Sequence, residues 1–360
     1  MVRVTGNFQS ESPLHPKAFE VLHAAFDNGW ANPGKLSQSG SKANKVKNEA
    51  LESISVALKV PVDSIFAFSS MSLGFYLGIH GLGIQGLLKD SAPLVHGATD
   101  RKDVFAIASR VSHQVLPCAL DGKLISPTQQ SPHSVLALSV ANAETGVIQE
   151  CDDIIQSVGT DRIFLDATAS GIRAQSTNNY STAIFDSRSW YGPSEVGLLV
   201  VKNKSQWSNP LPHLNAAHPN FDASLPLLLA SAVALENFSS EVGEANQRAR
   251  NFNSQLREAF AQIPDVDIAG SLDSSLAHLL SASFMNCNGE ELLRGIANDG
   301  FSVDSGSACT ADNLEPSHVL AAMGVLTHGN IRITIHPDTT QAEIDSLISS
   351  IKKNVERLRS

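Results

Sequence analysis

The apolar residues of this 360-residue chain fall into short runs that alternate with longer amphipathic segments. Apolar runs of about four to eight residues between turn residues are typical of buried strands, and apolar positions three or four apart indicate helices. The first half predicts strands at residues 64–68, 93–96, 134–140, 162–165, 182–185 and 196–201. It predicts helices at residues 16–26, 43–58, 73–88 and 152–158. This alternation favours an α/β fold with a mostly parallel sheet and helices on both faces.

The second half of the chain has a different pattern. A long helical run at residues 225–263 is followed by predicted strands at 266–269, 277–284 and 331–335 and by helices at 290–298 and 341–358. We therefore expect two domains. Residues 1–235 would form a large α/β domain with an N-terminal segment, and residues 236–360 a small C-terminal α+β domain.

Polar residues follow several of the predicted strands. They lie at residues 69–72, 142–144, 166 and 186–189. Ligands of open parallel sheets bind beyond the carboxyl ends of the strands. These segments are therefore expected to converge on one pocket.

Composition narrows the class of protein. The net charge of −10 argues against a nucleic-acid partner, and the basic stretch at residues 42–47 is read as a solvated helix face. The chain has no run of 18 apolar residues, and its start has no apolar signal region, so we expect a cytoplasmic protein without a membrane partner. The four cysteines, Cys118, Cys151, Cys287 and Cys309, have no metal-site spacing, so we predict free thiols and no metal.

Several motifs together carry a family resemblance. They are Asn32-Pro33-Gly34, residues 65–72, residues 140–149, Leu165-Asp166-Ala167-Thr168, Tyr191-Gly192-Pro193, the DSGSACT run at 304–310, residues 314–320 and Ile331-Arg332-Ile333. In this order, over roughly residues 12–350, they resemble the cysteine desulfurases of the class V aminotransferase family. The resemblance implies a fold-type I pyridoxal phosphate (PLP) transferase with a seven-stranded mixed sheet. It also implies a homodimer with active sites at the subunit interface.

The resemblance assigns roles to five residues. Asp166 matches the acid that pairs with the PLP ring nitrogen, although an aspartate that merely ends a strand would look the same. Ser72 matches a phosphate-binding threonine or is a plain helix N-cap, and Ser224 loosely matches a threonine that reaches the partner subunit's phosphate. Arg332 matches the arginine that binds the substrate carboxylate, unless it is structural, and we group Asn142 with it as substrate-binding.

The departures from the family pattern fall on the same pocket. Ser189 stands where the family has its Schiff-base lysine, and no lysine occurs between Lys123 and Lys202. The other altered positions are Arg101 for the ring-stacking histidine, Ala143 for an asparagine, Ala169 for a glutamine, Asp186 for a phosphate-binding serine, and Arg188 for a histidine. A carboxylate about 4 Å from a phosphate oxygen costs on the order of 4 kcal/mol, or about a thousandfold in affinity. We therefore expect no covalently bound PLP, and PLP stays a candidate only as a non-covalent ligand.

Cys309 lies in the run that, in one desulfurase branch, carries the sulfur-accepting cysteine. A Gly/Ser/Ala-rich loop gives a thiolate the access that a persulfide carrier needs. The alternative is a leftover loop with an unused thiol.

Three functions stay open from the sequence. The first is a non-desulfurase partner or sulfur-relay protein acting through Cys309, with an active desulfurase or a sulfur acceptor protein as its heterodimer partner. The second is an enzyme with altered chemistry, in which Ser189, Arg188, Asp166 and Arg101 line a pocket for another anionic ligand. The third is a desulfurase or transferase that uses non-covalent PLP, with Asp166 and Cys309 in their inherited roles.

Overall fold

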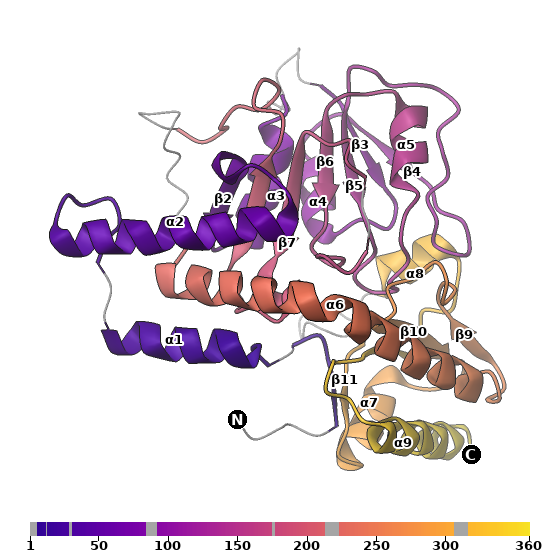
Figure 1. Ribbon diagram of the computed structural model, residues 1–360. Coiled ribbons are helices and arrows are strands. Elements are labelled where there is room, and N and C mark those ends of the chain that lie inside the picture. The colour runs from indigo at the N-terminus through magenta and orange to yellow at the C-terminus, as the bar shows by residue number, and fades with distance from the viewer. Residues whose placement is uncertain are drawn as a thin grey trace.

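The main sheet defines the larger part of the molecule (Figure 1). The computed structural model describes residues 6–11, 13–28, 31–83, 92–174, 177–212, 223–305 and 316–360. Within them seven strands form this sheet in the order β2-β8-β7-β6-β5-β3-β4. Their bounds are β2 Ile65–Phe68, β3 Leu94–Gly97, β4 His113–Leu116, β5 Val135–Ser139, β6 Ile163–Asp166, β7 Thr182–Asp186 and β8 Gly197–Val201. Only β8 runs antiparallel to its neighbours, which confirms the predicted mixed, mostly parallel α/β sheet.

Both faces of this sheet are buried, and successive strand residues serve opposite faces. In β5, Leu136 and Leu138 belong to one apolar core while Val135 and Ala137 belong to the other. The first core is covered by α1, α2, α5 and the first part of α6, and the second by α3 and α4. The bounds of these helices are α1 Pro16–Asn28, α2 Gln38–Leu58, α3 Met71–His80, α4 Lys102–Ala108, α5 Cys151–Val158 and α6 Leu225–Phe260. Burial on both faces explains why these strands have no polar alternation in the sequence.

The C-terminal part of the chain contains a second, smaller sheet, which is antiparallel and has the strand order β12-β10-β9. It packs with helices around a separate apolar core. The elements are β9 Val266–Ile268, β10 Leu279–Phe284, α7 Gly289–Asn298, α8 His318–Met323, β12 Asn330–Thr334 and α9 Gln341–Arg359. These elements match the strands and helices predicted for the C-terminal part, apart from shifts at their ends and α8, which we did not predict.

Helix α6 is one continuous 36-residue helix that runs from the main sheet to the smaller one (Figure 1). Its residues up to Phe238 pack in the first core, and those from Ala249 pack in the small-sheet core. The N-terminal strand β1 (Asn7–Phe8) pairs with β11 (Ser302–Val303), so this segment packs with C-terminal elements. The domain division at residue 235 remains a prediction, and these contacts place the change of core slightly later along α6.

Some element boundaries differ from the prediction. Helix α2 begins at Gln38 rather than residue 43, with the Ser37 side chain accepting from the Gly40 N–H as its cap. Helix α3 begins at Met71, and part of the predicted helix 73–88 lies outside the described residues. In the described ranges, none of the helices is both long and apolar enough to cross a bilayer.

Candidate functional site

A cavity of about 500 Å³ lies between the carboxyl edge of the main sheet and the small sheet. The predicted site residues that line it are Arg101, Asn142, Ala143, Ala169, Asp186, Arg188, Ser189 and Arg332. The segments after β5 and β7 therefore converge as predicted, because parallel strands deliver their carboxyl ends to one edge. Residues 69–72 are not among the lining residues of the described chain.

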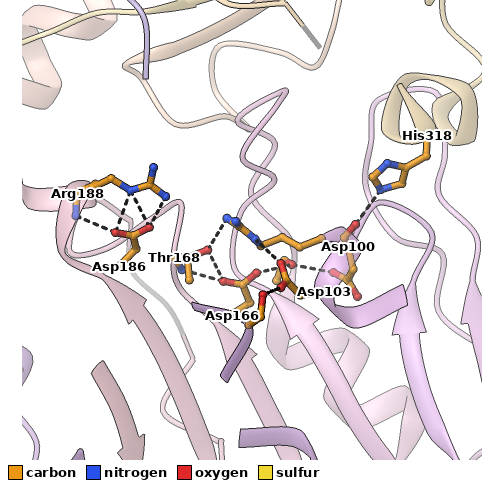
Figure 2. Close-up of polar contacts among 10 residues, drawn as sticks. Asp100, Asp103, Asp166, Thr168, Asp186, Arg188 and His318 are labelled. Atoms are coloured by element: carbon orange, nitrogen blue, oxygen red, sulfur yellow. Dashed lines mark hydrogen bonds and ion pairs between the residues drawn. The ribbon is translucent and has the colours of Figure 1, made fainter. Parts of the chain in front are cut away.

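Asp166 ends β6 and bonds to Thr168, which lines this cavity (Figure 2). Its Oδ1 atom accepts hydrogen bonds from the Thr168 N–H at 2.8 Å and the Thr168 hydroxyl at 2.6 Å. Arg101 Nη1 donates to Thr168 Oγ1 at 3.2 Å, and Arg101 Nε lies 3.8 Å from Asp103 Oδ2. Burial raises the pKa of Asp166 above its usual range, and the Arg101 charge opposes that shift. Arg101 thus serves as the counter-charge for two carboxylates.

Asp100 is a second buried acid at the same edge (Figure 2). Its Oδ2 accepts from the Gly97 N–H at 2.7 Å and its Oδ1 from the Ser139 hydroxyl at 2.7 Å. His318 Nε2 donates to the backbone carbonyl of Asp100 at 2.9 Å, which ties α8 to the main sheet. Burial raises the pKa of Asp100 to about 7, despite these hydrogen bonds. The site therefore holds an acid that is largely neutral below neutral pH.

Asp186 and Arg188 form a closed ion pair at the end of β7 (Figure 2). Arg188 Nη2 and Nε lie 2.7 and 3.0 Å from Asp186 Oδ2, and the Arg188 N–H donates to Asp186 Oδ1 at 2.9 Å. The Ser189 hydroxyl donates to the Asp186 backbone carbonyl at 2.7 Å. The three residues belong to β7 and the 3₁₀ turn Ser187–Trp190 that follows it, and their polar groups are mostly used within this turn.

Arg332 also has an acidic partner. Its Nη2 atom lies 2.7 Å from Asp304 Oδ2, and the same carboxylate oxygen accepts from the Ser10 N–H at 2.7 Å. Asp304 is buried and Arg332 half-buried, with 8% and 17% of their side chains exposed. Asn142, on the other side of the cavity, donates from Nδ2 to the Thr99 carbonyl at 2.8 Å and caps its own turn with Oδ1. In this structure Arg332 and Asn142 are held mainly by groups of the chain itself.

Two further predicted residues, Ser72 and Ser224, are not among the lining residues of the cavity. Ser72 is the second residue of α3 and donates to Asp103 Oδ1 at 2.6 Å, so the N-cap alternative for Ser72 is wrong because Ser70 has that position. Ser224 is the N-cap residue of α6 and makes no side-chain capping bond. Cys309 lies outside the described residues.

The sequence interpretation missed several residues of the site. Arg173, Tyr191, His278, Thr334 and His336 line the end of the cavity towards the small sheet. Tyr191 stood in the matched motif, but His278, Thr334 and His336 lie at or next to the ends of strands of the small sheet. Their proximity could have been predicted only from knowledge of how the small sheet packs against the main sheet.

The cofactor implied by the resemblance can be tested against these contacts. Lysine-bound PLP needs an amine within the site, a phosphate cradle without a carboxylate, and a free acid for the ring nitrogen. Lys102, at the start of α4, is the only lysine among the described lining residues. A buried carboxylate, Asp186, stands at the phosphate position implied by the resemblance. Asp166 keeps its acid, but the residues present do not fit lysine-bound PLP.

Comparison with known proteins identifies the family. The model of the family described as aminotransferase class V matches residues 120–347. The chain belongs to the class V aminotransferase family. Within it the chain is cysteine desulfurase-like, because relatives named cysteine desulfurase IscS are 31% identical to it, from Vesicomyosocius okutanii over 252 residues and Methylobacillus flagellatus over 379 residues.

The coverage of these relatives differs. The first alignment covers 67% of this chain and the chain spans 62% of that relative's length. The second covers 98% of this chain and 92% of the relative.

Solved structures show the same fold. A NifS-like protein superposes with a TM-score of 0.85 at 21% identity, covering 99% of both chains. The cysteine desulfurase CsdA from Escherichia coli superposes with a TM-score of 0.78 at 17% identity, covering 98% of this chain and 95% of the other. The fold-type I architecture predicted from the motifs is confirmed.

Proposed function

We propose that this protein is a cysteine desulfurase-like homologue that takes part in sulfur transfer as a partner or relay through Cys309, without lysine-bound PLP. The observation that carries the proposal is the turn at residues 186–189. There a carboxylate, its bidentate arginine and a serine hydroxyl bonded to the backbone take the places of a phosphate cradle and an amine. A chain that retains the family fold without that chemistry is suited to receive sulfur rather than to extract it from cysteine.

The relay step would be a thiol–persulfide exchange. The Cys309 thiolate attacks the outer sulfur of a donor persulfide, a new S–S bond forms at Cys309, and the donor leaves as a thiolate. No net oxidation occurs, so the step needs no other reagent. The donor in this proposal is an active desulfurase, bound in a heterodimer or met transiently, and the chain alone forms the homodimer typical of its family.

The first experiment tests the cofactor. The purified protein is mixed with PLP, reduced with borohydride and examined by absorption and peptide mass spectrometry. We expect no lysine to carry a reduced pyridoxyl group. The matched variant Asp186→Ser/Arg188→His/Ser189→Lys restores the family residues and should gain a label on the new lysine. A labelled lysine in the unaltered chain would refute the proposal.

The second experiment tests the relay. The chain is incubated with an active cysteine desulfurase and cysteine, and persulfides are mapped by mass spectrometry. We expect added sulfur on Cys309, none in Cys309→Ser, and no change in the control Cys118→Ser, whose half-buried thiol has its pKa raised by burial. A Cys309→Ser chain that acquires the same sulfur would exclude Cys309 as the carrier.

A second function is favoured by a separate observation. Eight buried side-chain atoms of the described chain have no hydrogen-bond partner, and six of them belong to residues that line the cavity. Buried polar groups are normally satisfied by protein, water or ligand. We propose that the cavity binds a small polar molecule, whether for altered chemistry or for regulation.

A further inference from the structure

Four side chains converge at the small-sheet end of the cavity. Arg173 comes from the loop after β6, His278 immediately precedes β10, Thr334 ends β12 and His336 follows two residues later. His278, Thr334 and His336 are 8%, 6% and 5% exposed. We call these four residues the Arg173 cluster. It shares the cavity with the predicted PLP-pocket positions but includes none of them.

The guanidinium of Arg173 is fixed in place by neutral groups. Its Nη2 donates to the Tyr191 hydroxyl at 2.7 Å and its Nη1 to Asn246 Oδ1 at 3.2 Å. Its Cζ lies 4.7 Å from the ring centre of Phe238 and 5.5 Å from that of Tyr191. Within the described chain no carboxylate forms an ion pair with Arg173, so this cation, unlike Arg188 and Arg332, lacks an anionic partner.

Each member of the cluster has a buried polar atom without a partner in the described chain. These atoms are Arg173 Nε, His278 Nδ1, Thr334 Oγ1 and His336 Nδ1. His336 Nε2 donates to the Gln9 carbonyl at 2.9 Å, so in the neutral ring its Nδ1 is an acceptor. The cluster thus offers an N–H from Arg173, a hydroxyl from Thr334, a ring nitrogen from His278 and a lone pair from His336.

Arg173 gives the cluster a positive charge. Burial and the nearby Arg173 charge both lower the pKa of His278, and His336 adds to that effect. Burial also lowers the pKa of His336, where the charges of Asp338 and Asp304 oppose that of Arg173. Leaving a partly buried cation and three hydrogen-bonding groups without partners is costly. An anion at this place would satisfy the charge of Arg173 and the donors of the cluster, whereas His336 Nδ1 could donate to the anion only after the ring takes up a proton.

We propose that the Arg173 cluster is a binding subsite for the carboxylate of a small organic acid. The inference rests on the second proposed function and specifies its ligand class. One cation and about three available donors suit a monoanionic group with two oxygens, whereas a phosphate dianion would need more positive charge and more donors. Arg332 is paired with Asp304, so an incoming carboxylate is directed to Arg173, the arginine of the described lining that forms no ion pair.

The test is calorimetric titration of the full chain with succinate, and in parallel with inorganic phosphate, in buffers of different ionisation enthalpy. Succinate should bind with uptake of protons, because the bound carboxylate raises the pKa values of His278 and His336. The affinity should therefore increase as the pH falls from about 7.5 to about 5.5. Phosphate should bind more weakly or not at all.

Variants locate the binding. Arg173→Gln should weaken succinate about tenfold to a hundredfold. The control Arg250→Gln, which alters an exposed arginine paired with Asp273, should bind like the parent. Thr334→Val keeps the shape and removes one donor, and it should weaken succinate about tenfold even if Arg173→Gln folds poorly. Thermal unfolding of each variant establishes that it is folded.

The outcomes separate the proposals. Equal succinate affinity in Arg173→Gln and Thr334→Val, or binding without proton uptake, overturns the subsite. Tight binding of phosphate or PLP without succinate overturns the carboxylate assignment but leaves the second proposed function standing. If none of these ligands binds, the subsite fails and the second function loses its support. The persulfide measurement on Cys309 is independent of all of these results.

Discussion

Replacing Asp100 by asparagine should change how stability depends on pH. The Asp100 carboxyl has a folded pKa of about 7 against an ordinary value of 3.8, so the folded protein holds this proton over a range in which the unfolded chain has lost it. The free energy of unfolding contributed by this group therefore falls as the pH rises from about 4 to about 7, and it is constant above that. This difference in pKa corresponds to a change of about 4 kcal/mol in the free energy of unfolding between about pH 4 and about pH 7.

Asparagine does not titrate, yet it can replace most of the contacts. Its oxygen can accept from the Gly97 N–H, and its amide can donate to Ser139 Oγ, which can rotate its hydrogen. Relative to the parent, Asp100→Asn should thus gain stability with increasing pH, by up to about 4 kcal/mol between about pH 4 and about pH 8. Because the charge of Asp166 helps to raise the pKa of Asp100, Asp166→Asn should move this change to lower pH.

The assay is urea unfolding at a series of pH values, followed by the fluorescence of tryptophan, including the fully buried Trp190. The quantity of interest is the difference in free energy of unfolding between variant and parent at each pH. Asp153→Asn, which alters an exposed aspartate of α5, serves as the matched control for removing a carboxylate at the surface. A difference for Asp100→Asn that is the same at about pH 5 and about pH 8 would show that Asp100 is not held protonated.

Three further substitutions or treatments probe the scaffold around the site. Ile54→Ala, at a fully buried position of α2, should cost about 2–5 kcal/mol in urea unfolding, whereas the exposed Val56→Ala should stay within about 0.5 kcal/mol. Gly171→Ala should lower the melting temperature in calorimetry, because φ is +50° and the new Cβ would lie 2.3 Å from Ser189 Oγ. Cys151, whose pKa burial raises to about 12, should resist alkylation at pH 8 until the chain is unfolded, and rapid labelling in the folded state would contradict its burial.

The strands that were predicted correctly are those buried on both faces. Residues 135–138 of β5 form an uninterrupted apolar run, because both faces of this strand contact a core. The missed strand β4 lies at the sheet edge, where three of its four residues are exposed, so the sequence HQVL carries no apolar run. The short helix α4 was missed for a related reason, since only Val104 and Ala108 are buried in it.

The candidate site was predictable where it follows from sheet topology. Residues 142–144 and 186–189 follow the carboxyl ends of their strands, and both segments line the cavity. The Arg173 cluster depends instead on how the small sheet packs over the main one. No local pattern marks His278 or His336 as partners of Arg173, because the three are far apart in the sequence and join only in the folded chain.

The ion pairs of the cavity decide where a negative ligand can bind. The charge of Arg101 acts on Asp103 and Asp166. Arg188 forms an ion pair with Asp186, and Arg332 forms one with Asp304. A ligand that competed for one of these arginines would leave a buried carboxylate without its partner, which costs several kcal/mol. Arg173 carries no such cost, because its described partners are neutral. The same acids that disfavour a phosphate at the inherited position therefore direct a carboxylate to Arg173.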